Sequence, residues 1–278
     1  MHQSENWADR LPAGFEGLKT RLSQAAQTRP AGFYHLFING QLLGRLHGEL
    51  GEIVRQQSTA WTNQWNAQRC ELHWNLPLDT LVSALTDLGR WLADQGWVPN
   101  WRGETQTLFD QNGVAIGELE RALFKVFGLR SQAVHLHVET GEGLIWVGVR
   151  ADSKKEHPGL LDNLCAGGVS SGETPQHAAW RELYEEAGLD STHLRGTCLT
   201  PLGGVEVSRA QGNGWHLEQC HLYFATMREG VHPHNQDGEV CGFQLMTPMA
   251  CAQAVNQNRF TPDAGLCCAL AMRRAHAV

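Results

Sequence analysis

The chain has 278 residues, of which 42% are hydrophobic and 18% charged, and its formal net charge is −7 at pH 7. This length predicts one large or two modest domains that bury a substantial core. The negative charge argues against a general nucleic-acid or anionic-membrane surface, and no apolar run approaches the length of a transmembrane helix.

The first half of the chain mixes helical and strand patterns. Apolar residues at helical spacing predict helices over 15–26, 78–95 and 118–127, the last ending at Gly128. The pair Asn39-Gly40 between two apolar runs predicts a β-hairpin, and residues 68–74 predict another strand. We therefore expect residues 1–130 to form a smaller α+β domain.

The second half of the chain has mainly strand patterns, followed by two helix starts. Alternating residues predict strands over 133–139 and 144–150, and further strands are expected at 196–209, 217–227 and 240–246. Thr-Pro pairs at 247–248 and 261–262 predict two helix starts. The loops near 151–160 and 208–216 are expected to be mobile. This order of elements predicts a mixed α/β layered domain over residues 131–278.

The cysteines and the N-terminal residues indicate the cellular compartment that we expect for the protein. The eight cysteines are scattered without a C-x-x-C pair, which is typical of reduced thiols in a cytosolic protein. The first residues lack the basic-then-apolar pattern of a signal peptide. A cytoplasmic location is therefore expected.

The segment from 167 to 189 carries the strongest chemical pattern. Thr174-Pro175 predicts a helix start and Gly188 its end. Glu182, Glu185 and Glu186 fall on one face of this helix, in its C-terminal half, where the helix dipole disfavours negative charge. Because hard cations such as Mg2+ prefer carboxylate oxygens, this clustering predicts a site for divalent cations.

The same segment resembles the Nudix box, G-x5-E-x7-R-E-U-x-E-E-x-G-U, where U is aliphatic. It matches at every fixed position: Gly167, Glu173, Arg181, Glu182, Leu183, Glu185, Glu186, Gly188 and Leu189. The resemblance implies a Nudix α/β/α sandwich, here preceded by the smaller α+β domain. It also implies a pyrophosphohydrolase that cleaves an organic diphosphate with Mg2+ or Mn2+.

The flanks are similar to the thiamine-pyrophosphokinase-associated Nudix group, whose members carry an extra N-terminal domain. Residues 101–104 resemble its W-R-N-E signature, with Gly103 in place of Asn, and residues 235–240 resemble its segment before the last core strand. This similarity, which runs from about residue 33 onward, implies hydrolysis of thiamine diphosphate or its oxidised forms to the monophosphate. Alternatives are hydrolysis of nucleotide sugars or dinucleotides such as ADP-ribose, or a non-catalytic nucleotide-binding module.

The predicted catalytic residues are Glu182, Glu186, Glu239 and Arg181. Glu182, Glu185 and Glu186 are the metal-ligand candidates, and the family implies the Gly167 carbonyl as a further ligand. Either Glu186 or Glu239 is the general base, although Glu239 is also consistent with a solvated loop residue. Glu173 is expected to pair with Arg181 as structural support, and Gly188 to end the helix.

Substrate contacts are assigned to the residues just before the box. Arg150 and Lys154 are candidates for binding phosphate, although a lysine in a polar loop is more often only solvated. Trp101, Trp146 and Trp180 could stack on a heteroaromatic ring, with core packing the commoner role for a tryptophan. The expected partner is a small-molecule diphosphate, with no nucleic acid and no membrane. A homodimer is one possible assembly, since many Nudix enzymes are dimers.

Overall fold

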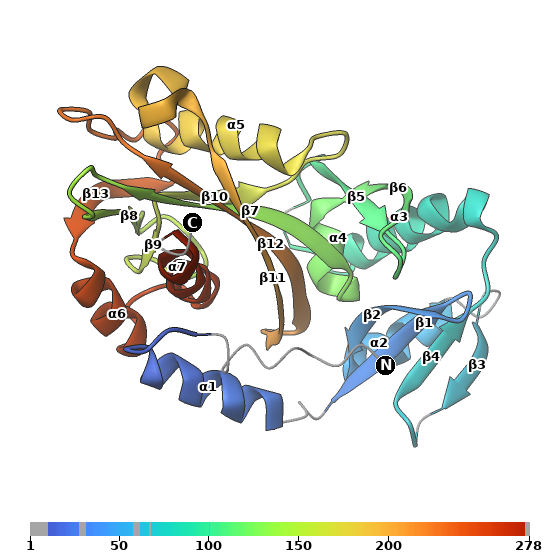
Figure 1. The fold of residues 1–278 in the computed structure, drawn as a ribbon. Coiled ribbons are helices and arrows are strands. Elements are labelled where there is room, and N and C mark those ends of the chain that lie inside the picture. The colour runs from blue at the N-terminus through green and yellow to red at the C-terminus, as the bar shows by residue number, and fades with distance from the viewer. Residues whose placement is uncertain (1–10, 28–31, 58–61, 67, 100, 276–278) are drawn as a thin grey trace.

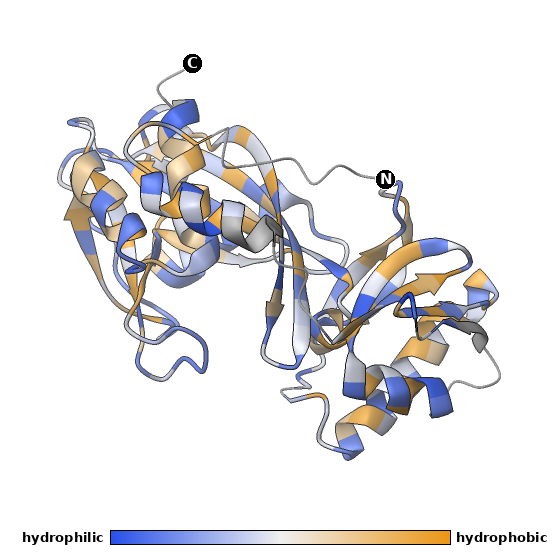
Figure 2. Ribbon diagram, turned by 90° about the horizontal axis from the view of Figure 1, so that it is seen from below, coloured by the Kyte–Doolittle hydropathy of each residue, from blue (hydrophilic) through white to orange (hydrophobic). Residues whose placement is uncertain are grey.

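The computed structural model describes residues 11–275, except 28–31, 58–61, 67 and 100. Residues before 130 form two small sheets with helices, and the later residues form one large sheet with helices on both faces (Figure 1). Within the described ranges, no helix is long and apolar enough to cross a bilayer. Hydrophobic and hydrophilic residues are mixed along the helices and strands of both parts, as amphipathic elements require (Figure 2).

The N-terminal part contains a four-stranded sheet of order β2-β1-β4-β3. The elements are β1 (Phe33–Ile38), β2 (Gln41–His47), α2 (Gly48–Gln57), β3 (Thr62–Asn66), β4 (Glu71–Trp74) and α3 (Leu78–Asp94). The predicted hairpin at Asn39-Gly40 is confirmed. Both turn residues have positive φ, 51° and 80°, as a two-residue turn of type I′ requires. Strands and helices share one core that includes Leu36, Leu81 and Leu123.

A second small sheet adjoins this core. It pairs β5 (Thr105–Phe109) with β6 (Ala115–Glu120), and α4 (Arg121–Phe127) follows directly. The prediction of a helix over 118–127 is therefore wrong for residues 118–120, which belong to β6. Residues 118–120 pair with 105–107 instead, so tertiary pairing overrides the helical period there. Gly128 ends the helix as expected, with a φ of 62°.

The large sheet has the order β11-β12-β7-β8-β13, with β10 paired to β7 and β9 to β8. Its elements are β7 (Arg130–Glu139), β8 (Ile145–Arg150), β9 (Leu161–Asn163), β10 (Cys165–Gly168), α5 (Pro175–Ala187), β11 (Thr200–Gln211), β12 (Gly214–Thr226), β13 (Val240–Met246), α6 (Pro248–Asn256) and α7 (Pro262–Ala275). Two 3-10 turns, 191–193 and 195–197, precede β11.

Helices cover both faces of this sheet. Val134, Leu136 and Val138 of β7 pack in the cluster that contains α5 residues. Ile145 and Val147 of β8 pack in the cluster that contains α6 and α7 residues, whereas Trp146, which lies between them, packs in the α5 cluster. Because alternate side chains of a strand point to opposite faces, the two clusters lie on opposite sides of the sheet. The α/β/α sandwich preceded by smaller sheets is confirmed.

Two features differ from what the sequence pattern and the order of elements along the chain predict. Residues 208–216, expected to be a mobile loop, belong to a long hairpin in which β11 and β12 turn at 212–213, with Gly212 at a φ of 60°. Helix α1 (Glu16–Gln27) lies against α6 rather than the small sheets (Figure 1). Asn256 accepts hydrogen bonds from the Gly17 and Leu18 amides at 3.0 and 3.3 Å. The division at residue 130 stays a prediction.

Candidate active site

Helix α5 has the bounds that the sequence predicts. The Thr174 side chain accepts a hydrogen bond from the His177 amide at 3.2 Å, Pro175 begins the helix, and Gly188 ends it with a φ of 66°. These caps fix the helical phase, which places Glu182 and Glu186 toward the sheet and leaves Glu185 exposed. The carboxylates therefore come from one helix but have different environments.

Glu182 and Glu186 are buried against strand β10. A Cβ atom on Gly167 would lie only 1.9 Å from Glu182 Oε1, so the carboxylate occupies the space that the glycine leaves. The Ala166 amide donates a hydrogen bond to Glu186 Oε2 at 3.1 Å. Burial raises the pKa of both carboxyl groups, and the charge of Glu182 raises that of Glu186 further. Two buried carboxylates of like charge form a site that favours a cation.

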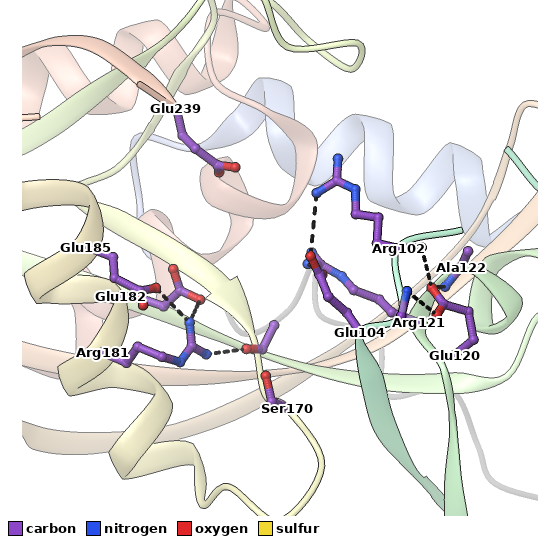
Figure 3. A network of polar contacts seen from close by, with 12 residues as sticks. Arg102, Glu104, Glu120, Arg121, Ala122, Ser170, Arg181, Glu182, Glu185 and Glu239 are labelled. Atoms are coloured by element: carbon purple, nitrogen blue, oxygen red, sulfur yellow. Dashed lines mark hydrogen bonds and ion pairs between the residues drawn. The ribbon is translucent and has the colours of Figure 1, made fainter. Parts of the chain in front are cut away.

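Arg181 connects the box residues (Figure 3). Its guanidinium donates two hydrogen bonds to Glu173, at 3.0 and 2.9 Å, and one to the Gly168 carbonyl at 2.9 Å. Nη1 donates to Glu182 at 2.7 Å and to Glu185 at 3.1 Å. The expected Glu173–Arg181 pair is thus present, and the same arginine also orients two carboxylates of the helix. Although burial opposes it, the hydrogen bonds from Arg181 hold the pKa of Glu173 below its usual range.

A second group of carboxylates faces α5 from the loop before β13. Oxygen atoms of Glu186, Asp237 and Glu239 all lie within 4.8 Å of one another. Glu239 forms an ion pair with Lys154, and its amide donates to Asp237 Oδ1 at 2.8 Å. Asp237 was not among the predicted site residues, although its position two residues before Glu239 in the same loop was a usable signal.

The two basic residues predicted to bind phosphate have carboxylate partners. Arg150 Nη1 lies 3.0 Å from Asp162 Oδ2, and the Arg150 side chain also donates to the Glu156 carbonyl at 3.3 and 3.2 Å. Lys154 points to Glu239 instead. Both residues therefore lie at the edge of the carboxylate cluster, but each is engaged within the protein.

The three tryptophans considered for stacking pack into hydrophobic clusters. Trp146 is buried beside α5, Trp180 packs against the same cluster, and Trp101 packs against the N-terminal core. Core packing, the commoner role for a tryptophan, accounts for all three. Of the three, Trp146 is buried, whereas Trp101 and Trp180 are only partly buried.

The donor set fits a hard divalent cation. Glu182 occupies a cradle that only a glycine at position 167 leaves open, and Glu186 meets two further carboxylates. Like charges held this closely raise one another's pKa, and a divalent cation relieves their repulsion. Glu182, Glu186 and Asp237 are the residues that would hold Mg2+ or Mn2+, the cations that the resemblance implies, and Glu239 lies beside them.

Comparison with known proteins gives consistent matches. A family model described as the NUDIX domain matches residues 129–264. The chain is 28% identical over 240 residues to Nudix hydrolase 20, chloroplastic, of Arabidopsis thaliana, covering 82% of this chain and 64% of that one. A crystal structure of a Deinococcus radiodurans protein has a TM-score of 0.47 at 21% identity, covering 62% of this chain and 99% of that one.

A bacterial relative is matched over most of its length. The chain is 33% identical over 149 residues to an uncharacterized Nudix hydrolase of Rhodococcus erythropolis, covering 52% of this chain and 78% of the relative. By contrast, the chain spans 64% of the length of the two Arabidopsis relatives, Nudix hydrolases 20 and 24. With every fixed residue of the box brought together around α5 and β10, the chain belongs to the Nudix hydrolase family.

Proposed function

We propose that this protein hydrolyses the diphosphate linkage of a small organic diphosphate with the help of Mg2+ or Mn2+. The observation that carries the proposal is the carboxylate cluster. Glu182 and Glu186 are buried on one face of α5, and Asp237 and Glu239 meet Glu186 from the opposite loop. A bound divalent cation would neutralise substrate charge and acidify a water molecule.

The residues of the site divide by environment. Glu182 and Glu186, buried and oriented by Arg181 and the Ala166 amide, would hold the cation, with Asp237, the Gly167 carbonyl and the exposed Glu185 as further candidate ligands. Glu239 is partly exposed and fixed by Lys154, which suits it to accept the proton of the attacking water. Arg181 keeps its partners in place through charge-assisted hydrogen bonds.

Among substrates, thiamine diphosphate and its oxidised forms lead, with the monophosphate as product. The support is the similarity of residues 101–104 and 235–240 to the thiamine-pyrophosphokinase-associated group. The Arabidopsis match covers 82% of the chain and so extends into the N-terminal part. Nucleotide sugars and dinucleotides such as ADP-ribose are the alternative substrates. A non-catalytic module is disfavoured because no box carboxylate is missing.

The test is a substrate panel with Mg2+ or Mn2+, in which release of the monophosphate is followed. The panel contains thiamine diphosphate, its oxidised forms, ADP-ribose, an ADP-sugar and a dinucleotide. Glu186→Gln should lower kcat at least about 100-fold on the active substrate while the protein remains folded. The matched control is Glu49→Gln, which removes one exposed carboxylate on α2 and should leave kcat unchanged.

Two results would contradict the proposal. Normal turnover by Glu186→Gln would show that the chemistry takes place elsewhere. Absence of monophosphate from every substrate with both metals would favour the non-catalytic module, in which case ligand binding would persist without turnover. Activity on ADP-ribose but not on thiamine diphosphate would support the proposed hydrolase activity and contradict the proposed substrate.

A further inference from the structure

The N-terminal part lies directly against the start of the Nudix box. The Ser171 amide donates a hydrogen bond to the Thr105 carbonyl at 3.0 Å, which joins β5 to the loop after β10. A Cβ atom on Gly168 would lie 2.6 Å from Gln106 Nε2 and 3.7 Å from Arg121 Cζ. The Arg121 guanidinium is therefore a neighbour of the strand that carries Gly167.

A buried carboxylate fixes the segment that presents these groups. Glu120 is 5% exposed and accepts hydrogen bonds from the amides of Arg102, Gly103 and Ala122 at 3.3, 2.9 and 3.4 Å. It thus ties the loop at 102–103 to the first turn of α4, where Arg121 begins the helix. Glu120 therefore fixes the position of both arginines relative to each other.

This arrangement brings two arginines to one carboxylate. Glu104 lies 3.1 Å from Arg121 Nη1 and 3.9 Å from Arg102 Nη1. Figure 3 shows this group in the same view as Arg181, Glu182 and Glu239. The side chains of Arg102 and Arg121 are 60% and 52% exposed, so the ion pairs with Glu104 are solvated and weak. Both guanidinium groups are available to an anionic ligand.

The other cations around the cluster are more fully engaged. Arg181 is shared among Glu173, Glu182 and Glu185, Arg150 pairs with Asp162, and Lys154 pairs with Glu239.

We propose that Arg121, assisted by Arg102, binds a phosphate of the substrate opposite the carboxylates that hold the cation. The proposal rests on the proposed function and adds the N-terminal part to the substrate site. A guanidinium presents parallel N–H groups that match phosphate oxygens, so Arg121 suits this contact better than a lysine would. The diphosphate then lies between the two parts of the chain, with its charge shared between the cation and the arginines.

The test measures binding separately from turnover. Inorganic pyrophosphate is titrated into the full chain with Mg2+ by calorimetry, and KM and kcat are measured with the most active substrate of the panel. Arg121→Gln should raise both the Kd for pyrophosphate and KM about 10- to 100-fold, since a charge-assisted bidentate contact is lost. Arg121→Lys should show a smaller increase, and Arg102→Gln an increase of a few-fold.

The matched control is Arg69→Gln, which removes an exposed arginine in the turn between β3 and β4, far from α5 (Figure 1). It should leave Kd and KM unchanged. Thermal unfolding should show that Arg121→Gln is folded, because its ion pair with Glu104 is solvated.

The outcomes separate this proposal from the hydrolase itself. If the wild type hydrolyses a diphosphate and Arg121→Gln has the same Kd and KM, the arginine contact is refuted while the hydrolase stands. If Arg69→Gln weakens binding as much as Arg121→Gln, the effect is general electrostatic attraction and the proposal is also refuted. If pyrophosphate binding depends on Arg121 but no substrate is cleaved, the site is supported and the hydrolase is not.

Discussion

Replacing Arg181 tests whether this residue holds the candidate site together. Arg181→Ala removes five hydrogen bonds, two to Glu173 and one each to Glu182, Glu185 and the Gly168 carbonyl. It also leaves the carboxylates of Glu173 and Glu182, which are only 15% and 11% exposed, without the positive charge of the Arg181 guanidinium.

The expected cost follows from these exposures. Removing one partner of a fully buried pair costs about 3–5 kcal/mol, whereas exposed pairs contribute less than about 1 kcal/mol. The Arg181 side chain is 31% exposed, so a loss at the lower end of the buried range, about 3 kcal/mol, is expected. For a chain of this size, that loss lowers Tm by roughly 6–12 °C.

The assay is thermal and urea unfolding in metal-free buffer, followed by circular dichroism. A double-mutant cycle with Glu173→Ala should give a coupling energy of about 1.5–3 kcal/mol, because the pair is bidentate and charge-assisted. Arg69→Ala, an exposed arginine in a turn, is the matched control and should change Tm by no more than a few degrees. A loss below about 0.5 kcal/mol for Arg181→Ala, or no coupling to Glu173, would refute the reasoning.

Three further predictions concern the cation. Gly167→Ala places a Cβ atom 1.9 Å from Glu182 Oε1, so Mg2+ affinity measured by calorimetry should fall at least about tenfold. Asp237→Asn should raise the Mg2+ concentration for half-maximal activity about tenfold, and an unchanged value would remove Asp237 from the site. Burial raises the pKa of Glu186 in the folded protein above the pKa of the same group in the unfolded chain. The stability that Glu186 contributes is therefore complete at pH values below the unfolded pKa, and it is lost as pH rises through the folded pKa. Tm of the metal-free protein should therefore decrease from pH 5 to pH 8, and Mg2+ should raise Tm more at pH 8, with a smaller pH dependence in Glu186→Gln.

Local patterns predicted much of the fold. Helix α5 follows from a capping threonine, a proline at the first helical position and a terminal glycine, all within one short segment. The Asn39-Gly40 hairpin likewise depends on two adjacent residues that tolerate positive φ. Where a distant strand decides the structure, local patterns were insufficient. Residues 118–120 have a helical period but pair with β5.

The same distinction applies to the site. The glutamates of α5 were predictable because helical geometry relates positions 182, 185 and 186 directly. Asp237 comes from a loop 51 residues beyond Glu186, and only the sheet topology brings the two together. Lys154 was predicted as a phosphate ligand, yet the same topology sets it beside Glu239. No spacing in the sequence relates Arg121 to Gly168, since that contact depends on how the two parts of the chain pack.

The carboxylates and the arginines have complementary roles in the charge balance of the site. Glu182 and Glu186 are disfavoured as charged groups by burial, by each other and by the helix dipole, so the fold alone holds them in an unfavourable state. A divalent cation would relieve this conflict, because its two positive charges offset those of the two carboxylates. A diphosphate would then bring negative charge that the cation, already offset by the carboxylates, would not balance. Arg102 and Arg121 are placed where that excess would meet guanidinium groups, which is why we expect substrate affinity to depend on the N-terminal part and cation affinity to depend on α5.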